Sequence, residues 1–117
     1  MRAYADFTRY ADETGARLTN EPRLVEVTSH FDVSQRELFD YISDFSRLSE
    51  WIWASKKSWA DDSKAEAPGQ VGSVRMIKGA FGEPVREVVK AYEAPRMLAY
   101  SANDGALLGL CTDHLGV

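Results

Sequence analysis

The sequence contains few side chains that could move protons near neutral pH. Its only histidines are His30 and His114, and the second follows an acidic residue, Asp113. Neighbouring residues of a strand point to opposite faces, so Asp113 and His114 cannot form a dyad with each other. His114 could still face an interior and act as a general base, because an imidazole titrates near neutrality. The alternative is a surface histidine near the end of the chain.

An acid and a base are placed to meet across a predicted hairpin. Arg75 and Glu87 fall on neighbouring strands, so they could point inward together. They would then form a buried ion pair or orient a polar group of a ligand. If they point outward, they form a cross-strand surface pair that contributes little to stability. The sequence leaves both alternatives open.

Large aromatic side chains offer apolar surface to a flat ligand. Three tryptophans cluster in one short stretch, where they could line the mouth of a cavity or fill the core. Methionine is an adaptable wall residue, and a tyrosine hydroxyl could meet a ligand carbonyl or a backbone partner. The candidate ligand-binding residues are Trp51, Trp53, Trp59, Arg75, Met76, Glu87, Tyr92, Tyr100 and His114.

Sequence motifs for metals, phosphates and hydrolase nucleophiles are missing. One cysteine and two histidines give no metal-ligand cluster. Gly79 and Gly82 belong to a predicted turn and form no phosphate-binding loop. No Gly-x-Ser-x-Gly pattern occurs, which argues against an α/β-hydrolase. We therefore expect neither a metal nor a cofactor.

Composition indicates an ordinary globular domain. The chain has 117 residues, 44% hydrophobic and 27% charged, which fits one domain. A net charge of −4 argues against nucleic acid and against anionic membrane surfaces as partners. No secretory signal and no run of about 18 apolar residues occur, so we expect no membrane span. The single cysteine, Cys111, favours a reducing compartment, and we expect a cytoplasmic location.

The first part of the chain predicts a helical extension and then a strand. Tyr4, Phe7 and Tyr10 recur at spacing three, which predicts a short helix within an extension of residues 1–22. Alternating residues over 23–32 predict a strand with one face in water.

A helix pair and a series of strands should follow. Ser34 and Glu37 form a capping-box pattern, and Ser43-Asp44 could begin a second short helix. Strands are predicted over residues 55–60, 72–78, 85–92, 97–102 and 107–117, joined by turn signals such as Asn103-Asp104-Gly105. Sequential strands with tight turns predict an antiparallel meander and an α+β fold. A twisted sheet of this kind curls over a helix and leaves a concave face.

Three stretches carry a resemblance to a known family. They are VEVTSHFDVSQRELFDYISDFSRLSEW, the glycine-led strand GSVRMIK and the hairpin EVVKAYEAPRMLAY. With them, residues 23–117 resemble the polyketide cyclase/dehydrase branch of the START-like superfamily. The resemblance implies a helix-grip fold, in which a curved antiparallel sheet encloses a cavity. It also implies a hydrophobic small molecule as partner, such as a polyketide, a lipid or an aromatic compound.

The resemblance leaves the activity open. Family members usually continue with further strands and a long C-terminal helix, whereas this sequence stops at Val117. We therefore expect an open sheet edge that could drive homodimer formation or strand exchange. Besides ligand binding, the alternatives are a protein-interaction module that uses this edge and a polyketide cyclase/dehydratase-like enzyme. In the enzyme, His114, Tyr100 or Glu87 would move protons.

Overall fold

The computed structural model describes residues 27–102 and 114–116, which form two short helices and one five-stranded antiparallel sheet. The elements are helix α2 (Gln35–Ser43), the 3-10 helix η1 (Phe45–Glu50), and strands β1 (Lys57–Asp61), β2 (Val74–Lys78), β3 (Val85–Glu93), β4 (Met97–Ala102) and β5 (His114–Gly116). The strands lie in the sheet in chain order, β1-β2-β3-β4-β5. The predicted α+β class and antiparallel meander are confirmed.

The predicted kinked helix pair is present, and hydrogen-bonded caps define where each helix begins. At α2, the Ser34 hydroxyl accepts a hydrogen bond from the Glu37 amide at 3.1 Å, and the Ser34 amide donates to the Glu37 carboxylate at 3.2 Å. This reciprocal arrangement satisfies backbone donors that a helix N-terminus leaves unpaired. Asp44 ends α2 and caps η1 by accepting from the Ser46 amide at 3.1 Å.

Replacing Ser34 with alanine should lower the free energy of unfolding by about 1 kcal/mol, because the Glu37 amide loses its acceptor. Urea denaturation followed by circular dichroism measures the change. Ser34→Thr is the matched control, since threonine retains the accepting oxygen. Equal losses in the two variants would contradict a capping role for the hydroxyl.

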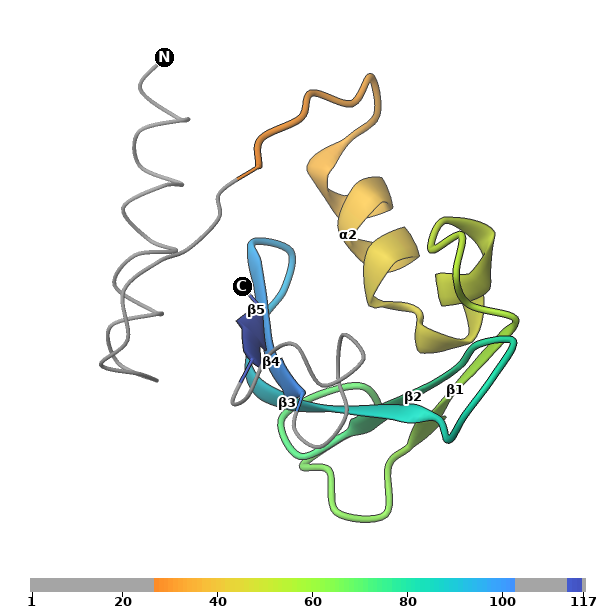
Figure 1. The fold of residues 1–117 in the computed structure, drawn as a ribbon. Helices are drawn as coiled ribbons and strands as arrows, with labels where there is room; N and C mark the ends of the chain where they lie inside the picture. The colour runs from red at the N-terminus through yellow and green to blue at the C-terminus, as the bar shows by residue number, and fades with distance from the viewer. Residues whose placement is uncertain (1–26, 103–113, 117) are drawn as a thin grey trace.

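The sheet curves, and both helices cover its concave face. In Figure 1, strands β1, β2 and β3 lie beneath the helices, while β4 and β5 rise beside them. The buried core between the layers consists of Phe45, Leu48 and Val89, with Ile52, Ile77, Tyr92 and Leu98 packed against it. Among the described residues, β1 and β5 are the outer strands of the sheet, so this part of the chain does not close into a barrel.

A β-bulge in β3 changes which residues reach the concave face. Val89 pairs with Tyr100 and Ala91 pairs with Ala99, so Lys90 is an extra residue in β3. Because of this extra residue, Tyr92 lies on the same face as Val89 and meets the Phe39 ring of α2 edge-on at 5.6 Å.

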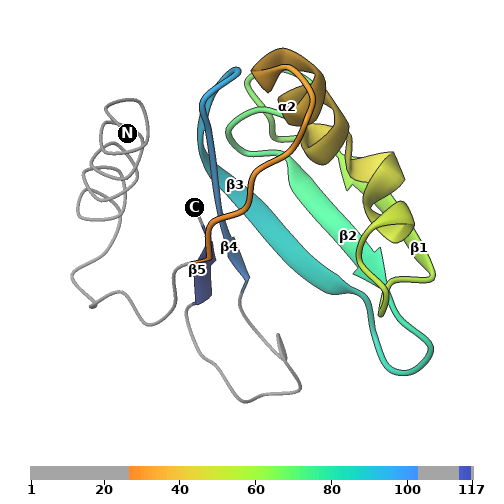
Figure 2. The same ribbon diagram turned by 90° about the horizontal axis from the view of Figure 1, so that it is seen from above.

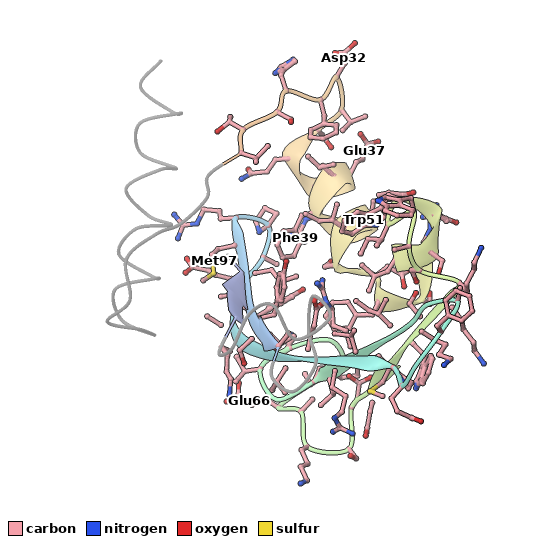
Figure 3. The ribbon with its side chains drawn as sticks, in the orientation of Figure 1. Asp32, Glu37, Phe39, Trp51, Glu66 and Met97 are labelled. Atoms are coloured by element: carbon pink, nitrogen blue, oxygen red, sulfur yellow. The ribbon has the colours of Figure 1, made fainter. Side chains whose placement is uncertain are left out.

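The opposite face of the same strands has its own apolar cluster. It consists of Ala91, Met97 and Ala99, all buried. Figure 3 shows Met97 and Phe39 on opposite sides of β4.

Hydrogen bonds tie the long loop between β1 and β2 to the sheet. The Asp62 carboxylate accepts from the Ser73 hydroxyl at 2.6 Å and from the Gly69 amide at 2.9 Å. The Gly72 amide donates to the Val89 carbonyl of β3 at 3.0 Å. Gly72 has a φ of 91°, in the left-handed region that favours glycine.

The predicted strand over residues 23–32 is wrong for the part that the structure describes. Residues 27–31 have no regular secondary structure. Val27 and Phe31, which the alternation assigned to one face, are 82% and 54% exposed. Alternation shows which face a strand could bury, but a strand also needs a neighbouring strand to pair with. The predicted extension of residues 1–22 lies outside the described residues, as does most of the predicted strand 107–117.

Candidate functional site

The sheet register places several chemically active residues in one line. Arg75 of β2 pairs with Glu87 of β3, Glu87 pairs with Ala102 of β4, and Ala102 pairs with His114 of β5. We call these four residues the cross-strand row. Neighbouring strands lie about 4.8 Å apart, so the backbones of Glu87 and His114 are separated by roughly 10 Å.

Arg75 and Glu87 form a buried ion pair. The Arg75 Nε donates to Glu87 Oε2 at 2.6 Å, and Nη2 contacts the same oxygen. The two side chains are only 4% and 12% exposed. Of the two alternatives that the sequence left open, the inward one is therefore the one the structure contains.

Two aromatic rings enclose the guanidinium of Arg75. Its Cζ lies 4.1 Å from the Tyr100 ring centroid and 5.3 Å from the Phe45 ring centroid. A cation within about 6 Å of a ring face is attracted by the electrons of the ring. Since Phe45 belongs to η1 and Tyr100 to β4, three elements hold the charge between the helices and the sheet.

Such a pair contributes little net stability. The desolvation of two charges offsets most of their attraction, and apolar replacements are often neutral or stabilising. What the pair supplies is hydrogen-bonding capacity inside an apolar layer. The guanidinium carries five N–H donors, and the carboxylate has a second oxygen besides the one that Arg75 contacts. The site can therefore orient a polar group that enters the layer.

Several predicted site residues lie elsewhere. Trp59 pairs with Met76, which pairs with Arg86, so these three occupy the face of the sheet opposite Arg75. Trp53 is 93% exposed and Trp51 is 44% exposed, both in the loop after η1. The structure brings Tyr100 to the ion pair and places Tyr92 on the same face of the sheet, but it does not bring the three tryptophans there.

Sequence reasoning did not single out Phe45 of η1 and Ser58 of β1 as candidate site residues. Phe45 directly follows Asp44, the residue that caps η1, so the sequence did indicate that a helix begins there. Its contact with Arg75 depends on how η1 packs against the sheet, which the sequence does not show. Ser58 pairs with Ile77 and is 8% exposed. Its hydroxyl has no hydrogen-bond partner among the described residues. In the sequence, the only indication of this buried hydroxyl was that a serine occupies a strand position whose neighbours on the same face are apolar.

Two side chains with shifted pKa values lie outside the cross-strand row. A hydrogen bond with Glu50 raises the pKa of the Tyr41 phenol on α2. Hydrogen bonds from Ser63 lower the pKa of the Asp61 carboxyl at the end of β1. Both residues are at the surface, so these shifts reflect local partners and do not tune the buried pair.

Residues 27–102 and 114–116 contain no candidate metal site and no candidate membrane span. No group of three or more His, Cys, Asp or Glu side chains there could hold a metal ion. Within the same residues, no helix has the length and apolar character needed to cross a bilayer.

Comparison with known proteins gave one finding. A family model described as "Polyketide cyclase / dehydrase and lipid transport" matches residues 22–111. No curated protein and no solved structure matches the chain. The matched segment includes both helices, strands β1 to β4, and three of the four residues of the cross-strand row.

Proposed function

This chain belongs to the polyketide cyclase/dehydrase and lipid transport family and has its α+β helix-grip fold, and from that premise we propose that it binds a hydrophobic small molecule. The ligand would lie between the helices and the concave face of the sheet. The observation that carries the proposal is the buried Arg75–Glu87 pair, enclosed by Phe45 and Tyr100. Aromatic and aliphatic side chains around a few placed polar groups are typical of small-molecule sites.

The charge of the site limits the polar group of the ligand. Arg75 and Glu87 neutralise each other, so a ligand carboxylate would gain from Arg75 but would be repelled by Glu87. A neutral carbonyl can accept from the guanidinium, and a neutral hydroxyl can donate to the carboxylate. We therefore propose an apolar ligand that carries ketone or hydroxyl groups, as polyketides and sterol-like lipids do.

Native mass spectrometry of the full chain should detect a bound apolar compound, and titration with a flat polycyclic ketone then gives a Kd. Replacing Tyr100 with alanine should weaken binding about fivefold to tenfold, because the ligand loses an aromatic contact beside Arg75. The matched control is Trp59→Ala, which removes an aromatic ring from the opposite face and should leave the Kd unchanged.

The ligand series also tests the proposed polarity. The polycyclic ketone should bind more tightly than the parent hydrocarbon and more tightly than a carboxylic acid of the same size. Tightest binding of the acid would contradict a neutralised Arg75–Glu87 site. Equal weakening by Tyr100→Ala and Trp59→Ala would contradict binding at the concave face.

A second candidate function is proton transfer in a cyclisation or dehydration. The observation that favours it is that Glu87 and Tyr100 both lie beside Arg75. The Arg75 Nε donates to Glu87 Oε2 at 2.6 Å, and the Arg75 Cζ lies 4.1 Å from the Tyr100 ring centroid. Glu87 would act as the base and Tyr100 as the acid towards a ligand held between them. Unchanged turnover of a poly-β-ketone substrate in the variants Glu87→Gln and Tyr100→Phe would exclude it.

A further inference from the structure

One end of the molecule presents exposed aromatic side chains on two neighbouring loops. Trp53, in the loop after η1, and Phe81, in the β2–β3 turn, are each 93% exposed. The Lys56 amide donates to the Lys78 carbonyl at 2.7 Å, which joins the bases of the two loops. Figure 2 shows both loops at the same end of the molecule. We call residues 51–59 together with 78–82 the aromatic–lysine end.

The charge of this end is opposite to that of the chain. Residues 51–59 and 78–82 contain three lysines, Lys56, Lys57 and Lys78, and the one acidic residue of the same β2–β3 turn is Glu83, so this end carries an excess of two positive charges, whereas the whole chain has a net charge of −4. Lys57 lies over the Trp59 ring at 5.4 Å, and Lys78 donates to the Gly82 carbonyl. The lysines thus lie at the bases of the two loops, and Lys57 also contacts the Trp59 ring of β1. At physiological salt, the acidic residues that lie more than about 8 Å from this end are largely screened from it. The lysines therefore give this end a positive local charge.

We infer that the aromatic–lysine end docks onto anionic lipid bilayers. Tryptophan favours the membrane interface, and each lysine near an anionic surface adds to the attraction. Two protruding loop tips suit a soft bilayer better than a protein partner, which usually needs about 800 Å² of complementary surface. The overall acidic charge, which argued against membranes at the level of composition, does not decide the question because the lysines are segregated. This inference is independent of the proposed ligand.

Vesicle sedimentation of the full chain tests the inference. Vesicles of phosphatidylcholine with 30% phosphatidylglycerol should bind the protein, pure phosphatidylcholine should bind it far less, and high salt should release it. The double variant Lys56→Glu/Lys57→Glu should partition at least roughly thirtyfold more weakly. The double variant Trp53→Ala/Phe81→Ala should lose at least roughly tenfold, because two apolar side chains no longer insert.

Matched controls separate this surface from net charge and from general hydrophobicity. Lys64→Glu/Lys90→Glu makes the same charge change at exposed positions elsewhere, and Phe31→Ala removes an exposed ring near α2. Both controls should bind within twofold of the parent protein. Brominated phosphatidylcholine should quench the fluorescence of Trp53, and Trp53→Phe should abolish most of that quenching.

Two results would overturn the inference. One is failure of the parent protein to bind anionic vesicles at low salt, even if it binds another protein through this end. The other is equal weakening by the aromatic–lysine variants and by their controls. The exchanged side chains of Trp53, Phe81, Lys56 and Lys57 are all exposed, and thermal unfolding of each variant verifies that the fold is retained.

Discussion

Replacing Arg75 with methionine should lower the free energy of unfolding by about 3–5 kcal/mol, the usual result of removing one partner of a buried ion pair. Methionine keeps much of the length of the arginine side chain but leaves the Glu87 carboxylate buried without its guanidinium. The cation between Phe45 and Tyr100 is also lost. Because domains of this size are stable by only about 5–15 kcal/mol, urea denaturation should show a large shift of the midpoint.

Two further variants show whether charge causes the loss. The double variant Arg75→Met/Glu87→Leu removes both charges and should recover most or all of the stability, as apolar replacements of buried pairs often do. Arg86→Met exchanges the exposed neighbour of Glu87 on the other face and should change stability by less than about 0.5 kcal/mol. If the double variant is as unstable as Arg75→Met, then packing of the arginine stem, and not the buried carboxylate, accounts for the effect.

Replacing Gly72 with alanine should destabilise the fold by about 2–5 kcal/mol. The left-handed backbone at φ 91° costs a residue with a Cβ about 1–2 kcal/mol. The added Cβ would also lie 2.3 Å from the Lys64 carbonyl oxygen, a backbone atom that cannot move without shifting the loop, which adds about 1–3 kcal/mol. Equilibrium unfolding of the variant, or a loss of folded signal in circular dichroism, measures the effect.

Gly69 provides the matched control for Gly72. Its φ of 75° is also left-handed, but a Cβ added there meets no heavy atom within 4 Å. Gly69→Ala should therefore show only the conformational part of the loss, about 1–2 kcal/mol. Losses of the same size at both glycines would mean that the contact with Lys64 relaxes at little cost.

Local signals in the sequence were sufficient for most of the fold. The Ser34–Glu37 capping box and the Asp44 cap depend on residues three or fewer positions apart, so they could be identified without tertiary information. The turn signals and alternating patterns likewise gave strands β1 to β4 within a few residues of their observed bounds. Pairing of consecutive strands then brought Arg75 and Glu87 onto neighbouring strands.

The choice of face could not be made from the sequence. Arg75 and Met76 are adjacent in β2, and hydropathy alone favours burying the methionine over the charge. The structure does the reverse, because Glu87, Phe45 and Tyr100 compensate the buried guanidinium. These partners come from three separate elements, so only the assembled structure shows why Met76 and Trp59 lie opposite the ion pair.

The extra residue in β3 lies at a position where the chain can vary in length as well as in side chain. Lys90 is exposed, so many side chains should be acceptable at this position. Without Lys90, Ala91 would follow Val89 directly, and regular alternation would keep Ala91 paired with Ala99 and Tyr92 on the face that meets Phe39. Deleting the residue would therefore remove the bulge and its local bend but leave every later side chain of β3 on its present face.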